Sequence, residues 1–152
     1  MTRNQLLANI EVKQSLLCVG LDPDLKRMPQ GLKGDAEGVA TFCKLIIDAT
    51  ADHAVAYKPN FAFFEALGRH GWQALDEVAK HLSSMDVFTI ADAKRGDIGN
   101  TASQYAQGIL GEMGFDAITV APYMGKDSVT PFFMEGKWAI GLGLTSNAGA
   151  ED

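Results

Sequence analysis

The sequence lacks several features that would assign it to a specialised class of protein. It has only two cysteines in 152 residues, too few for a disulfide framework, so Cys18 and Cys43 are expected to be reduced core residues of a cytoplasmic protein. Its 13 Lys and Arg stand against 19 Asp and Glu, a formal net charge of −6, which argues against non-specific binding to nucleic acid. No apolar run approaches the roughly 18 residues of a membrane span, and the first residues lack the apolar segment of a signal peptide.

Two nucleotide-binding signatures are also missing. Neither Gly-x-Gly-x-x-Gly nor a P-loop follows the first predicted strand, which disfavours a nucleotide cofactor. The hydrophobic fraction of 47% is typical of a globular protein, and the length favours a single domain over residues 1–152. The acidic net charge still allows a small anionic substrate, because a local group of lysines can outweigh it.

Apolar, β-prone runs alternate with helical periodicity at a spacing of roughly 30 residues. This rhythm predicts an α/β protein with a parallel sheet. It leaves two architectures open, an open doubly wound sheet of five strands or the first five units of a (β/α)8 barrel, which needs about 250 residues when complete. The predicted strands are residues 16–21, 54–57, 87–91, 117–121 and 138–144, and the predicted helices are 2–14, 35–51, 61–82 with a break near Gly68 and Gly71, 100–114 and, weakly, 126–135.

Charged residues follow directly after the third predicted strand. Asp92 and Lys94 lie two residues apart, so their side chains are expected to project to the same side of the strand. Gly96 and Gly99 let the next loop turn sharply, which is expected to fold Asp97 back toward the other two. A plain salt-bridged strand end is the alternative explanation, because such charges at the end of a buried strand must pair.

Further polar residues follow other predicted strands. Asp22 comes after the first, Lys58 after the second and Ser146 after the fifth. Sites in α/β proteins form where the carboxyl ends of parallel strands meet, so these residues are candidates for one site with Asp92 and Lys94. Taken alone, Asp22 is better explained as a turn residue before proline. Lys58 has the alternative of a solvated strand end.

The stretch Asp92-Ala-Lys94-Arg-Gly-Asp97-Ile-Gly-Asn-Thr101 resembles the Asp-x-Lys-x-x-Asp signature of the orotidine 5′-monophosphate decarboxylase family. Three flanking segments are similar to its bacterial, longer-loop branch, and the resemblance covers the whole chain. They are Gly20-Leu-Asp-Pro23, Ala56-Tyr-Lys-Pro-Asn60 and Leu144-Thr-Ser-Asn147.

The resemblance implies a (β/α)8 barrel that acts as a homodimer and as a cofactor-independent carboxy-lyase. The implied reaction converts orotidine 5′-phosphate to uridine 5′-phosphate (UMP), the last step of de novo pyrimidine synthesis, without metal, flavin, pyridoxal phosphate or nicotinamide. Lys94 is the implied proton donor, within a catalytic set that also contains Lys58, Asp92 and Asp97.

The same resemblance implies the substrate-binding residues. Asp22 would contact the ribose and Ser146 the pyrimidine, while Asn60 would either help to hold the site or cap a helix. Asp97 and Thr101 would reach across the dimer into the partner's site.

The family continues through three further strands, and loops near the last two grip the substrate phosphate. These are missing from the 152 residues, so the chain is expected to be a truncated or partial form of a longer product. Two other functions stay open. One is a magnesium-dependent keto-sugar-phosphate decarboxylase or hexulose-phosphate synthase, although Lys58 stands where those enzymes carry an acid. The other is a catalytically inactive barrel fragment.

Overall fold

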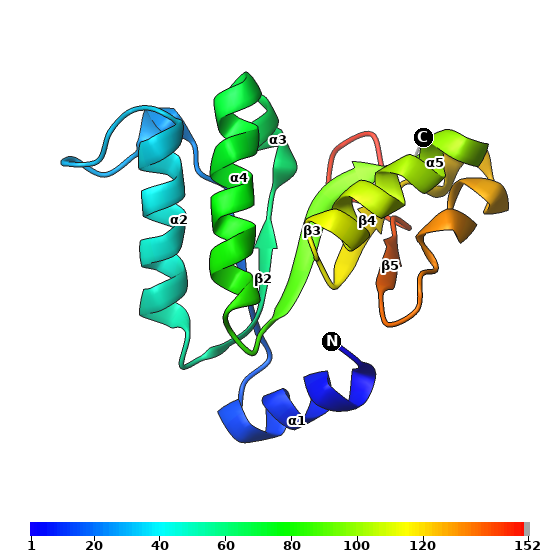
Figure 1. Cartoon of the computed structure of the whole chain (residues 1–152), viewed down its shortest axis with the longest axis horizontal. Coiled ribbons are helices and arrows are strands. Elements are labelled where there is room, and N and C mark those ends of the chain that lie inside the picture. The colour runs from blue at the N-terminus through cyan, green and yellow to red at the C-terminus, as the bar shows by residue number, and fades with distance from the viewer. Residues whose placement is uncertain (151–152) are drawn as a thin grey trace.

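The structure is a computed structural model that describes residues 1–150. Strands and helices alternate along the chain (Figure 1). The strands are β1 (Leu17–Leu21), β2 (Ala54–Pro59), β3 (Phe88–Arg95), β4 (Ala117–Val120) and β5 (Trp138–Gly141), and the α-helices are α1 (Arg3–Lys13), α2 (Ala36–Thr50), α3 (Phe61–Glu65), α4 (Gly68–Ser83) and α5 (Gly99–Ala106). The single domain predicted over residues 1–152 stays a prediction, and its last two residues lie outside the described part of the chain.

The strand order identifies the architecture. All neighbouring strands pair in parallel, in the order β1-β2-β3-β4-β5. A doubly wound sheet reverses its strand order at a switch point, whereas a barrel adds each strand beside the previous one. The open doubly wound alternative is therefore wrong, and a partial (β/α)8 barrel is confirmed, with five sequential parallel strands of which the first three are followed by α-helices.

Local sequence signals account for the helix ends. Thr2 caps α1 in a reciprocal capping box with Gln5, and Asp35 caps α2 by accepting a hydrogen bond from Gly38 N, as its position predicted. The predicted helix over residues 61–82 is divided into α3 and α4 at Gly68, which has a φ of +61°. The weak helix prediction at 126–135 is wrong: short 3₁₀ turns replace it, because Pro131 interrupts the hydrogen-bonding pattern.

The two faces of the sheet pack differently. One face lies against α2 and α4, which run side by side in Figure 1, and buries large side chains such as Tyr57, Phe64 and Leu75. The other face is apolar only toward the amino ends of the strands, where Phe88 lies against Trp138. Helix α1 lies at that end of the sheet (Figure 1) and contributes Leu6 and Ile10 to the cluster.

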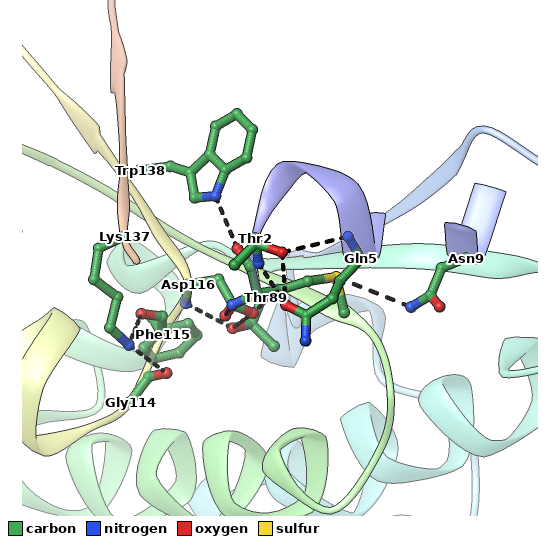
Figure 2. A network of polar contacts seen from close by, with 10 residues as sticks. Thr2, Gln5, Asn9, Thr89, Gly114, Phe115, Asp116, Lys137 and Trp138 are labelled. Carbon is green, nitrogen blue, oxygen red and sulfur yellow. Dashed lines mark hydrogen bonds and ion pairs between the residues drawn. The ribbon is translucent and has the colours of Figure 1, made fainter. Parts of the chain in front are cut away.

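Hydrogen bonds also stabilise the amino end of the β3–β4 pair (Figure 2). The Thr89 hydroxyl donates to Asp116 Oδ2 over 3.0 Å and accepts from Asp116 N over 3.0 Å. The Met1 amino group pairs with Asp116, and Trp138 Nε1 donates to the Met1 carbonyl oxygen over 3.0 Å. This end of the sheet is therefore tied together by structural contacts.

The two cysteines do not share one environment. Cys43 is fully buried in α2, and burial raises its pKa to about 12. Cys18 is exposed because β1 has a neighbouring strand on only one side within residues 1–150. The prediction that Cys18 is a core residue is therefore wrong. Over the same residues, no helix combines the length and apolar character needed to cross a membrane.

The α3–α4 junction gives a test of the packing. A Cβ added at Gly71 would overlap the carbonyl oxygen of Phe64, so Gly71→Ala is expected to lower the free energy of unfolding by about 1–3 kcal/mol. Gly108→Ala is the matched control, since a Cβ there meets nothing within 4 Å. Urea denaturation measures both, and equal stability of the two variants would contradict the packing described.

Candidate active site

Two lysines and one aspartate meet at the carboxyl end of the sheet. Lys58, on β2, donates to Asp92 Oδ2 over 2.7 Å. Lys94, two residues after Asp92 on β3, donates to Asp92 Oδ1 over 2.5 Å. Because β2 and β3 are parallel neighbours, their ends bring these groups together as the sequence predicted. The three side chains carry a formal charge of +1 in total, which suits an anionic ligand.

Asp92 is the most buried member of this cluster. Its side chain is 8% exposed, against 34% for Lys58 and 51% for Lys94. Burial alone would raise the pKa of Asp92, but hydrogen bonds from Lys58 and then Lys94 outweigh it, so the pKa lies below its ordinary value. The carboxylate is therefore ionised at neutral pH and balances part of the charge of both lysines.

The backbone at Lys94 departs from regular strand geometry. Lys94 has a φ of +45°, which costs a non-glycine residue about 1–3 kcal/mol. The pairing of β3 with β4 shifts register between Ala91 and Arg95, as at a bulge that redirects side chains. Lys94 N donates to the hydroxyl of Thr119 over 2.9 Å, and that hydroxyl donates to Asp92 Oδ1 over 3.1 Å.

Asp22 and Asn60 lie beside this cluster. Asn60 pairs with Asp92 as an isolated parallel bridge, and its Nδ2 donates to Asp22 Oδ2 over 3.0 Å. Its Oδ1 accepts from Ala62 N and caps α3. Asn60 thus caps α3, as one of the two alternatives predicted, and also holds Asp22, while its part in a substrate site stays a prediction.

The remaining predicted residues are not in contact with the lysines. Asp97 accepts a hydrogen bond from Ile98 N over 2.8 Å and takes part in no ion pair within residues 1–150. The prediction that it folds back toward Asp92 and Lys94 is wrong for a single chain, because the loop turns its carboxylate onto its own backbone. Thr101 and Ser146 are exposed, in α5 and after β5 respectively.

Arg95 has a structural role that its position in the signature did not reveal. It pairs with Glu65, and its guanidinium lies 5.9 Å from the ring centroid of Phe61 and 5.4 Å from that of Tyr105. These contacts join the end of β3 to α3 and α5. The Arg95 side chain is largely buried by these contacts, with 19% of its surface exposed.

Thr119 was missed from sequence. It lies in the apolar strand β4, is 7% exposed, and contacts both Asp92 and the Lys94 backbone. Threonine is frequent in strands for steric reasons, so its presence there gave no signal of a functional contact.

The fold and the site define a class: a barrel-type α/β protein with an ammonium–carboxylate cluster at the carboxyl ends of adjacent strands. Residues 15–152 match the family described as Orotidine 5′-phosphate decarboxylase / HUMPS. The chain belongs to this family.

Individual relatives agree with this assignment. The chain is 52% identical to the orotidine 5′-phosphate decarboxylase of Bacteroides fragilis and 54% identical to that of Christiangramia forsetii, covering 100% of this chain and 57% of each relative. The structure of Leishmania donovani OMP decarboxylase superimposes with a TM-score of 0.84 at 39% identity, covering 97% of this chain and 55% of that one. The chain thus spans little more than half the length of these three relatives.

The Asp92 contacts predict a specific loss of stability. Asp92→Asn leaves two neighbouring ammonium groups without a counter-charge, and is expected to lower the free energy of unfolding by about 1–3 kcal/mol at pH 7. The pKa of Asp92 is lower in the folded state than in the unfolded chain, where it is roughly 3.9. The ionised carboxyl therefore stabilises the folded wild type at any pH above that unfolded-state pKa. This contribution to stability is lost as the pH falls through the pKa that Asp92 has in the folded protein.

Urea denaturation between pH 3 and pH 7 measures this effect. The difference in free energy of unfolding between wild type and Asp92→Asn should be constant above about pH 5 and should become smaller below about pH 4. Asp76→Asn is the control, because its pair with Lys80 is a surface contact worth less than about 0.5 kcal/mol. A gap that is unchanged at low pH would contradict the ionised state of Asp92.

Proposed function

We propose that this chain carries the catalytic strand ends of an orotidine 5′-phosphate decarboxylase. The observation that carries the proposal is the sharing of Asp92, whose two oxygens each accept from a different lysine. Family membership and the relatives' function support it. Asp22, Asn60, Thr101 and Ser146 are the proposed substrate-binding residues, and the cytoplasm is the proposed location.

The reaction breaks the bond between C6 of the pyrimidine and its carboxyl group. Carbon dioxide leaves and the electron pair stays on C6, which has no adjacent carbonyl or imine to delocalise it. Fixed positive charge then has to stabilise the carbanion. The Lys94 ammonium provides that charge and donates its proton to C6, giving uridine 5′-phosphate, and solvent reprotonates the amine.

Asp92 has two candidate roles in this scheme. Its carboxylate next to that of the substrate would destabilise the ground state by repulsion, an explanation that is contested. Its contacts with Lys58 and Lys94 favour the other role, because a carboxylate held by both lysines fixes their positions before substrate binds.

A metal-dependent member of the same family is the second candidate function. It would need carboxylates available to a divalent cation. Asp92 Oδ2 accepts from Lys58, and Oδ1 accepts from both Lys94 and Thr119, so a cation at Asp92 would have to displace ammonium groups. This observation favours the decarboxylase that uses lysine.

The central test is turnover of orotidine 5′-phosphate by the purified chain, followed by its absorbance change. Lys94→Ala is expected to lower kcat by about 10²–10⁴-fold, the range for removal of a general acid. Lys44→Ala is the control, since Lys44 pairs with Glu77 on the helical side, and it should retain wild-type turnover. Equal rates for wild type and Lys94→Ala would refute the role of Lys94.

Two further outcomes separate the alternatives. Loss of activity on adding a chelator would support the metal-dependent candidate. A folded wild type without any turnover would contradict an active chain and support the inactive fragment.

We further propose a homodimer in which Asp97 and Thr101 complete the partner's site. Two observations support this: Asp97 makes no ion pair within the described chain, and the neighbouring Ile98 is 54% exposed. No ion pair therefore holds Asp97 near the lysines of its own described chain. The exposed Ile98 side chain beside it is available to be covered by a partner subunit.

Mixing two inactive variants tests the shared site. In a heterodimer of Lys94→Ala with Asp97→Ala, one site has both native residues and the other has neither. Random exchange makes half of the dimers mixed, so activity should recover to about a quarter of wild type. Activity that stays at the sum of the separate variants would show that each site is built from one chain.

A further inference from the structure

The hydroxyl of Thr119 bridges two parts of the proposed catalytic cluster. It donates to Asp92 Oδ1 over 3.1 Å and accepts from Lys94 N over 2.9 Å. Thr119 is 7% exposed and lies on β4, the strand next to β3. One buried hydroxyl therefore satisfies both a carboxylate and a backbone N–H of the adjacent strand.

We propose that Thr119 is a positioning residue, whose hydroxyl holds the Asp92 carboxylate and the left-handed backbone of Lys94 so that the Lys94 ammonium is fixed toward the reacting carbon. The expected effect of Thr119 on turnover rests on the proposed function. The structural part of the proposal, the placement of Asp92 and Lys94 by Thr119, is independent of which substrate binds.

The strained backbone explains why a hydroxyl is needed at this point. Lys94 has a φ of +45°, and such a conformation persists only when its surroundings hold it. The bond from Lys94 N to Thr119 is the contact that ties this peptide to β4. Without it, this N–H would lose its partner on β4 and the bulge would relax, moving the Lys94 side chain.

The opposite end of the same two strands offers a matched comparison. Thr89 is also 7% exposed, and its hydroxyl likewise bridges the carboxylate and the N–H of a residue on the adjacent chain segment, Asp116 (Figure 2). The two threonines have the same burial and the same bonding. Of the two, only Thr119 contacts the lysine–carboxylate cluster. A difference in activity between the Thr119 and Thr89 variants therefore shows the effect of that contact.

The experiment compares Thr119→Val, which keeps the shape and removes the hydroxyl, with Thr119→Ser, which keeps the hydroxyl. Thr119→Val is expected to lower kcat roughly tenfold to hundredfold, the equivalent of one hydrogen bond to a charged group, with KM within about twofold. Thr119→Ser should stay within about threefold of wild type. Thr89→Val should lose comparable stability but keep kcat. Thr119→Ala replaces Thr119→Val if the valine variant does not fold.

Two measurements do not depend on turnover. Carboxyl ¹³C titration should show a higher pKa for Asp92 in Thr119→Val, since one hydrogen bond to its ionised form is gone. Exchange of the Lys94 amide hydrogen should be roughly tenfold faster. Thr89→Val should change neither.

The outcomes distinguish the two proposals. An unchanged Asp92 titration and unchanged Lys94 exchange in Thr119→Val would overturn the positioning role, whatever the activity. A wild type without turnover, combined with the expected titration and exchange changes, would refute the decarboxylase function and leave the positioning role supported. Equal kcat losses in Thr119→Val and Thr89→Val would show a general effect of losing a buried hydrogen bond between β3 and β4, and would overturn the assignment.

Discussion

The arrangement at the carboxyl end of the sheet depends on one carboxylate shared by two ammonium groups. Asp92 is nearly buried, and its ionised form is acceptable there because Lys58 and Lys94 each donate to a different oxygen. The lysines in turn are held close together, despite their like charges, by that single aspartate. The sequential parallel sheet makes this possible, since it brings the ends of β2 and β3 side by side.

Contacts that stabilise the fold and groups of the proposed active site lie at opposite ends of the sheet. Its amino end is closed by apolar contacts with α1 and by the Thr89–Asp116 bonds, none of which involves the lysines. Its carboxyl end holds the charged cluster, a strained lysine and polar bridges from β1 and β4. A rigid end thus supports an end whose groups are held in conformations that cost energy.

Much of this could be predicted from sequence, because the signals were local or periodic. The strand–helix rhythm predicted the fold class, and the spacing of Asp92 and Lys94 predicted that they share a side. Other features depend on tertiary context. Whether Asp97 folds back is decided by a loop geometry that composition does not encode. Thr119 lies within an apolar run, where its hydroxyl has no periodic signature, and the exposure of Cys18 follows from the edge position of β1.

The exposed thiol of Cys18 has a practical consequence. Desolvation raises its pKa, and the charge of Lys58, two residues beyond the Cys18 register partner Ala56 on β2, acts in the opposite direction. The chain's other thiol, that of Cys43, is fully buried. A thiol-reactive fluorophore would therefore label the β1 position selectively. It would place a spectroscopic reporter on β1, next to the strand that carries Lys58, while leaving every charged side chain native.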